Sequence, residues 1–142
     1  MGNFGQGTVV RVNPTTGKRT IISQSHGKQI IGEGPAFVSI TDISMSRDGK
    51  SVLVLDLAQE AVFDVNLVTG NRVSVSRSYG EQAGSGFNML NPHGIQTVDD
   101  GYMVTDFGAP GVIFVDQEGK RCLLYTSPSP RDATLSRMPS SA

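Results

Sequence analysis

The segment Asp56-Leu57-Ala58-Gln59-Glu60-Ala61-Val62-Phe63-Asp64-Val65-Asn66 decides the fold, because related copies of it occur elsewhere in the chain. Residues 3–13 and 106–116 have the same order of residue types: an Asp or Asn, a short loop, an apolar run and a second Asp or Asn. Copies spaced by about 50 residues indicate stacked supersecondary units, each made of several secondary-structure elements. The repeat therefore predicts a scaffold before it predicts any activity.

The residues around this segment predict short β-strands. On its N-terminal side, residues 52–55 form an unbroken apolar run, which is typical of a strand covered on both faces. Before that run, Asp48-Gly49 predicts a type I′ hairpin turn with positive φ at both central residues. On its C-terminal side, Gly70 is placed for a left-handed turn, and residues 72–76 form a last strand.

The other two copies have matching surroundings. The third unit repeats the hairpin signal at Asp100-Gly101 and the turn glycine at Gly119, and the first unit keeps the turn glycine at Gly17. No stretch shows useful helical periodicity. Four short strands joined by tight turns at this period form a propeller blade. A β-sandwich or jelly roll would not require such close register between units. We therefore predict an all-β fold, a partial β-propeller of about two and a half four-stranded antiparallel blades.

The loops between units carry a family resemblance. Gly32-Glu33-Gly34-Pro35-Ala36-Phe37 corresponds to Gly84-Ser85-Gly86-Phe87, which Asn91-Pro92-His93-Gly94-Ile95 follows. These motifs resemble NHL-type repeats, and residues 10–20 are similar to the second half of repeats in bacterial streptogramin-lyase-like propellers. The resemblance covers nearly all of residues 3–121 and implies a six-bladed propeller. The second unit departs from it, with Ile40-Thr41-Asp42 where the third has Pro92-His93-Gly94.

The end of the chain breaks the repeat. Residues 122–132 back-translate without strain to a transposase adapter of the kind used in sequencing libraries, and residues 136–142 fit the end of such an adapter. The alternative is a genuine Ser/Pro-rich disordered tail. We therefore expect residues 1–121 to be a partial NHL-like propeller and residues 122–142 to be a disordered, non-native tail. Because residue 3 corresponds to the end of a strand, we also expect truncation at both ends, with uncovered faces and edges that promote association.

Composition excludes several function classes. The formal net charge is −1, and the sequence has no basic patch with interleaved aromatic residues, so it does not favour a nucleic-acid partner. It contains no apolar stretch long enough to predict a membrane span. The single cysteine, Cys122, falls in the predicted tail, so residues 1–121 contain no thiol for a disulfide or a thiolate metal site. The resemblance to bacterial relatives implies a secreted or periplasmic location.

Candidate site residues lie in the loops that blade geometry brings to one face, near a central channel. Residues 32–42 meet residues 56–60 there, and residues 84–93 meet residues 106–110. The candidate ligand-binding residues in these loops are Asp42, Asp56, Glu60, Asp106 and Phe107. Carboxylates around a channel could bind a divalent cation. The alternative for the recurring Asp56 and Asp106 is structural, since an Asx side chain accepts backbone N–H bonds from the loop it opens.

His93 is the candidate catalytic residue, because neutral imidazole is a common metal ligand or general base. The resemblance implies that it lies near a metal or an opened ring ester, and the structural alternative is a hydrogen bond to a loop carbonyl. We predict a ligand- or protein-binding scaffold, with a metal-assisted lyase or lactonase of the streptogramin-lyase or gluconolactonase type as the rival. A purely structural domain of a larger protein is a third alternative. The sequence identifies no cofactor; a divalent cation in a full-length protein is what the rival would require.

Overall fold

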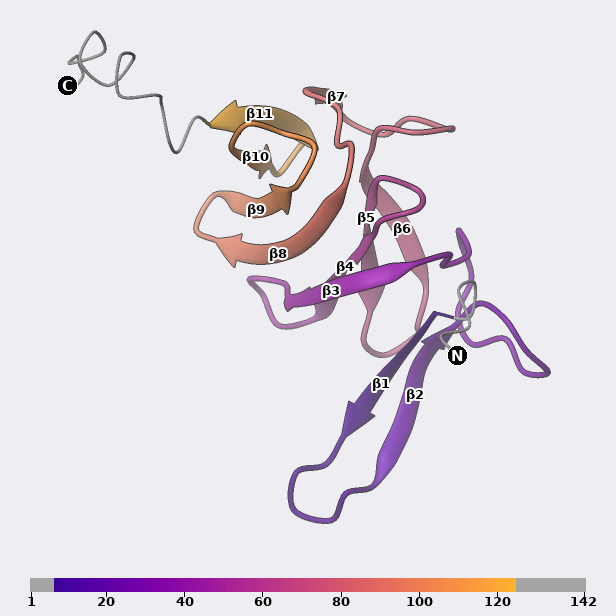
Figure 1. Ribbon diagram of the computed structural model, residues 1–142. Helices are drawn as coiled ribbons and strands as arrows, with labels where there is room; N and C mark the ends of the chain where they lie inside the picture. The colour runs from indigo at the N-terminus through magenta and orange to yellow at the C-terminus, as the bar shows by residue number, and fades with distance from the viewer. Residues whose placement is uncertain (1–6, 125–142) are drawn as a thin grey trace, which may run out of the picture.

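The computed structural model describes residues 7–124, and within them every regular element is a β-strand (Figure 1). The all-β expectation is therefore confirmed for this part of the chain. No helix in the described part is long and apolar enough to cross a membrane. The strands in chain order are β1 Thr8–Val12, β2 Arg19–Gln24, β3 Ile40–Met45, β4 Ser51–Asp56, β5 Ala61–Asn66, β6 Arg72–Arg77, β7 Ser85–Gly86, β8 Pro92–Val98, β9 Gly101–Asp106, β10 Val112–Asp116 and β11 Lys120–Leu124.

The strands form three sheets in which chain neighbours pair antiparallel. β3, β4, β5 and β6 make a four-stranded sheet, and β8, β9, β10 and β11 repeat that order in a second sheet. The short β7 adds a fifth strand by pairing parallel with β11. β1 and β2 form a two-stranded sheet equivalent to the last two strands of the others.

Register confirms the internal repeat at the level of single residues. The pairs Val12 with Arg19, Val65 with Arg72, and Val115 with Arg121 occupy the same place in the three sheets. Gly17, Gly70 and Gly119, which turn the chain before these arginines, have φ of 72°, 76° and 82°, as predicted. The three copies of the deciding segment thus lead into equivalent strands β1, β5 and β10.

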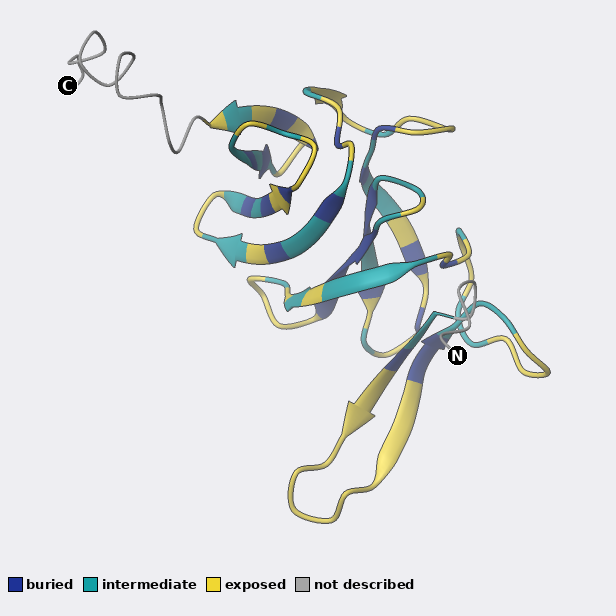
Figure 2. Ribbon diagram, viewed as in Figure 1, coloured by how far each residue is buried: buried dark blue, intermediate teal, exposed yellow. Residues whose placement is uncertain are grey.

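The core lies between the sheets, and the central strands β4 and β5 of the middle sheet are buried along most of their length (Figure 2). Val52 and Val54 of β4 pack toward β1 and β2, together with Phe63 and Val65. Leu53 and Leu55 point the other way and pack on the sheet of β8 to β11. All six residues of β4 are buried, so the prediction of a strand covered on both faces is confirmed.

Strands β3 and β8, the first strands of the two large sheets, lie side by side (Figure 1). The Ser44 and Thr97 hydroxyl oxygens are 2.9 Å apart. The Ser44 hydroxyl also accepts the Thr97 N–H at 3.0 Å. Side-chain hydrogen bonds therefore join the two sheets along this edge.

The two Asp-Gly hairpins do not adopt the predicted type I′ turn. Gly49 has φ of 72°, but Asp48 does not have positive φ. The Gly49 N–H donates to Ser46 O, so this hydrogen bond closes a turn in which the left-handed Gly49 is the last residue and not a central one. Gly101 does not have positive φ either. A Cβ at Gly101 would lie 2.0 Å from the Val115 carbonyl oxygen, so glycine is needed there for close strand approach.

The C-terminal boundary also differs from the expectation. β11 runs to Leu124, and Cys122, Leu123 and Leu124 pair with residues of β10. These three residues extend the β10–β11 ladder, which begins at the pair of Arg121 with Val115, so the strand continues past the predicted boundary at residue 121. The remaining predicted tail, like Asn3 of the first repeat, lies outside the described residues.

Candidate functional site

Asp56 and Asp106, the last residues of β4 and β9, each hold two loops together. Each carboxylate is buried and accepts hydrogen bonds from backbone N–H groups of two loops. The donors to Asp56 are Val38 (2.7 Å), Ser39 (3.1 Å) and Gln59 (3.2 Å), and the donors to Asp106 are Leu90 (2.7 Å), Asn91 (2.9 Å) and Gly108 (2.8 Å). This geometry supports the structural alternative for both residues.

His93, at the start of β8, is held from two sides. Its Nδ1 lies 3.0 Å from the Asn91 carbonyl oxygen, so Nδ1 carries the proton in this contact. Its ring stacks on Phe107, with centroids 4.3 Å apart and planes 18° from parallel. The structural alternative for His93, a hydrogen bond to a loop carbonyl, is therefore present. In the neutral ring this tautomer leaves a lone pair on Nε2.

Phe107 is the most exposed aromatic ring at this face, with 74% of its surface accessible. Its backbone N–H donates to Asn91 O at 3.0 Å, and the preceding Asp106 fixes the loop on both sides. Leu90 is 55% exposed and lies against Gly108 of the same loop. Phe107 and Leu90 thus form an apolar surface on a loop whose backbone is held by several hydrogen bonds.

Glu60 is the one non-glycine residue in the described part with positive φ, at 48°. Burial raises the pKa of its carboxyl group, and the negative charge of Asp106 in the neighbouring sheet raises it further. Its carbonyl oxygen accepts the Ser78 N–H at 3.0 Å, which fixes the chain leaving β6. Strained backbone of this kind persists only where the surroundings determine it.

Asp42 lies on β3 between the two large sheets. Its Oδ2 accepts the backbone N–H of Ile95 in β8 at 2.8 Å. The side chain therefore joins two neighbouring strands, and one of its oxygen atoms is already occupied. Asp42, Asp56 and Asp106 thus share a structural use, while His93 and Phe107 are in direct contact with each other.

The Gly-rich loops at residues 32–34 and 84–86 lie against the last strand of the following sheet. A Cβ at Gly32 would lie 1.9 Å from the Gly70 carbonyl oxygen, and a Cβ at Gly34 would lie 2.0 Å from the Arg72 carbonyl oxygen. In the same way, a Cβ at Gly84 or Gly86 would lie 2.1 Å from the carbonyl oxygen of Gly119 or Arg121, respectively. Glycine is required in both loops because two backbones touch.

Sequence reasoning missed the residues that these loops surround. The guanidinium group of Arg72, 4% exposed, donates to Ser23 Oγ at 2.7 Å and to Pro35 O at 2.6 Å. Arg121, 3% exposed, donates to Ser76 Oγ at 2.7 Å and to Phe87 O at 2.6 Å. We call these two sets the arginine anchors.

Burial lowers the pKa of both arginine side chains. The signal available in the sequence was Arg followed four residues later by Ser, at 19 and 23 and again at 72 and 76.

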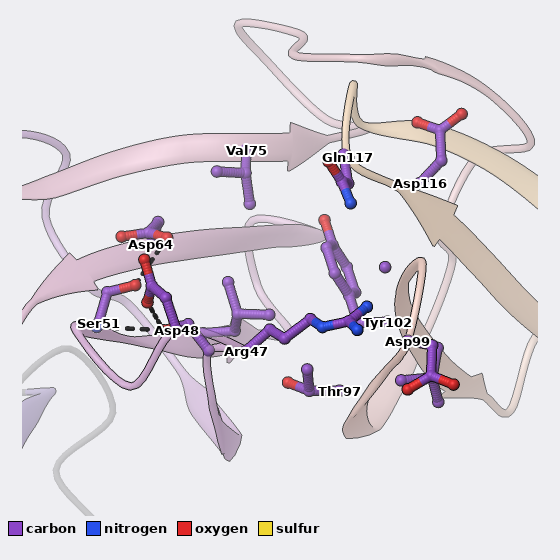
Figure 3. Close-up of a pocket in the computed structure, with 14 residues that line it drawn as sticks. Arg47, Asp48, Ser51, Asp64, Val75, Thr97, Asp99, Tyr102, Asp116 and Gln117 are labelled. Carbon is purple, nitrogen blue, oxygen red and sulfur yellow. Dashed lines mark hydrogen bonds between the residues drawn. The ribbon is translucent and has the colours of Figure 1, made fainter.

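A cavity of about 400 Å³ lies at the opposite end of the two large sheets, between their hairpin turns (Figure 3). Asp64, Asp99 and Asp116 line it together with Arg47 and Tyr102. The Tyr102 hydroxyl is buried without a hydrogen-bond partner in the described part of the chain. Burial raises the pKa of Tyr102, and the nearby Ser76 side chain offsets only part of that rise.

This cavity is separate from the predicted loops. Within residues 7–124, no three His, Cys, Asp or Glu side chains are grouped closely enough to hold a metal ion. No protein-family model matches the sequence, and a search of curated proteins finds no significant relative.

Proposed function

We propose that the chain is part of an NHL-like β-propeller whose loop face serves as a binding scaffold. The propeller arrangement is supported by the interactions that recur from unit to unit at equivalent positions. The carboxylates of Asp56 and Asp106 bind equivalent loop N–H groups, and Arg72 and Arg121 donate to equivalent hydroxyl and carbonyl groups. Such repetition is expected when each unit contacts its neighbours through one shared interface.

The stacked pair of His93 and Phe107 carries the binding proposal. Exposing an aromatic ring to water is unfavourable, and here the Phe107 ring also stacks on the ring of His93. Because the supporting loop is already fixed by Asp106, a ligand would not have to order it. The surface suits a flat aromatic or apolar group, either in a small molecule or on a side chain of a partner protein.

Binding of indole and of N-acetyl-tryptophanamide to the isotope-labelled 142-residue chain tests this proposal. We expect chemical-shift changes at the rings of His93 and Phe107 that saturate with ligand concentration. Phe107→Ala should abolish them, whereas Tyr79→Ala, which removes another exposed aromatic ring, should not. Saturation that Phe107→Ala leaves unchanged would refute the proposal.

One observation favours the rival function, a metal-assisted lyase or lactonase. The Nδ1 contact with Asn91 O directs the free lone pair of neutral His93 to Nε2, where it can act as a base or ligand. In lactone hydrolysis the base would remove a proton from water as the oxygen attacks the ring carbonyl. The ring ester bond then breaks and the ring oxygen takes up the proton. Turnover of a δ-lactone with added Mn²⁺, lost in His93→Gln, would support this rival.

A further inference from the structure

Two opposite faces of the stacked sheets are uncovered in the described part of the chain. The front face is formed by Val10, Val12, Arg19 and Ile21 on β1 and β2. The rear face is formed by Met103, Val112, Phe114 and Leu124 on β9, β10 and β11. At the front, Val10, Val12 and Ile21 are 40%, 53% and 40% exposed. At the rear, Leu124 is 39% exposed and the other three residues are partly exposed.

The equivalents of the front-face residues show what such a face contacts. Val12 corresponds to Val65 and Val115, which pair with the anchor arginines in the same register and are fully buried. Both valines pack against the sheet that precedes their own. The front face therefore has the shape and composition of the side that contacts a preceding sheet.

The rear face corresponds in the same way to the side that contacts a following sheet. In the middle sheet this side carries Leu53 and Val62, and both pack on the sheet of β8 to β11. Their equivalents by register are Met103 and Val112. The chain thus carries both halves of an interface that it already forms twice within itself.

Arg19 supplies a polar component to this interface. It is exposed, whereas Arg72 and Arg121 are buried and donate to carbonyl groups of the preceding connection. The exposed guanidinium group of Arg19 can be hydrated by solvent, and it would gain protein acceptors only if the connection of another sheet packed against it. The front face is therefore complementary to a sheet and its connection, and two front faces would bring like charges together.

We propose that the chain associates with itself head to tail, the front face of one copy packing on the rear face of another. This contact is heterologous, because different surfaces of the two copies meet, and it adds copies until a ring closes or continues as an open assembly. The interface is the sheet-to-sheet packing already present between β1–β2, β3–β6 and β8–β11. The inference rests on that packing and not on what the loop face binds.

Two blocking substitutions test the direction of association in the full chain, under reducing conditions that keep Cys122 from cross-linking. Val12→Glu blocks the front face and Leu124→Glu blocks the rear face. Val68→Glu is the matched control, because Val68 is 93% exposed on a turn outside both faces. Far-UV circular dichroism and thermal unfolding identify any variant that fails to fold.

Sedimentation velocity and light scattering over a concentration series provide the readout. We expect wild type and Val68→Glu to exceed the 15.1 kDa monomer mass progressively, and each blocked variant alone to associate at least about tenfold more weakly. An equimolar mixture of the two blocked variants should stop at a heterodimer, since each retains one working face.

Three outcomes would overturn the proposal. Wild type could remain a monomer throughout the concentration range. The Leu124→Glu chain could associate as strongly as wild type while Val12→Glu does not, which would indicate front-to-front pairing. The mixture of folded blocked variants could form no heterodimer.

Discussion

Replacing Arg72 with alanine should destabilise the protein far more than the same change at its repeat equivalent Arg19. The Arg72 guanidinium donates five hydrogen bonds, to oxygen atoms of Ser23, Ile31, Gly32, Gly34 and Pro35, at 2.6 to 3.4 Å. It also lies 5.3 Å from the centroid of the Phe37 ring. Truncation leaves these acceptors without their donor inside a contact between two sheets.

The magnitude follows from opposing contributions. A hydrogen bond to a charged group contributes about 1.5–3 kcal/mol, but the cost of burying the guanidinium offsets part of the sum. The acceptors left behind are neutral, and each buried acceptor without a donor costs about 1–3 kcal/mol, so the expected net loss of unfolding free energy is about 3–5 kcal/mol. For Arg19→Ala, a change at an exposed side chain, the expected effect is within about 0.5 kcal/mol.

Equilibrium urea unfolding, followed by far-UV circular dichroism at a concentration where the chain is monomeric, measures both variants. With an m-value of about 2 kcal/mol/M, the Arg72→Ala midpoint should fall by roughly 2 M. The Arg19→Ala midpoint should stay close to that of wild type. Equal midpoints for the two variants would refute the reasoning, because they would show that the five hydrogen bonds contribute no more than one solvated side chain.

Three further predictions concern the loops and turns. Gly86→Ala should lower the free energy of unfolding by more than about 3 kcal/mol or prevent folding, because its Cβ would lie 2.1 Å from a backbone carbonyl oxygen. Gly49→Ala, whose Cβ would have nothing within 4 Å, should lower it by only about 1 kcal/mol in urea unfolding. Asp106→Asn should lower the free energy of unfolding by about 1–3 kcal/mol in the same assay, because one oxygen that accepts a backbone N–H is replaced by an NH₂ group. The control Asp100→Asn, at an exposed position, should leave the free energy of unfolding nearly unchanged. Because the pKa of Glu60 is raised in the folded state, protonated Glu60 stabilises wild type at low pH, and this contribution is lost as pH rises through that pKa. The stability of Glu60→Gln relative to wild type should therefore increase from about pH 3 to about pH 7. A difference in unfolding free energy that stays constant over this range would contradict the shift.

Much of the fold was predictable because its signals are local. The apolar run of residues 52–55 indicated a strand covered on both faces, and β4 is buried along its whole length. The turn glycines Gly17 and Gly70 were identified from their spacing and adopt positive φ. The type of the Asp-Gly hairpins was not predictable from the dipeptide, since Gly101 is required by the neighbouring strand and not by the turn.

The candidate site was predicted less well, because its hydrogen bonds join residues far apart in the chain. Arg72 appears in the sequence as an ordinary charged strand residue, and its acceptor Ser23 is 49 positions away. Asp56 and Asp106 each end the second strand of a unit, as the repeat indicated, but the N–H groups that occupy their oxygens come from loops that the repeat does not specify. The stack of His93 on Phe107 joins strand β8 to the turn after β9, and no periodicity in the sequence indicates it.

The arginine anchors also affect the order in which the protein can fold. Each one joins the last strand of a sheet to a hydroxyl group 45 or 49 positions earlier, so it forms only after the preceding sheet and its connection have taken shape. Folding should therefore be slow and should progress from neighbour to neighbour. The amide protons of the middle sheet, which has an anchor on both sides, should exchange with solvent more slowly than those of the outer sheets.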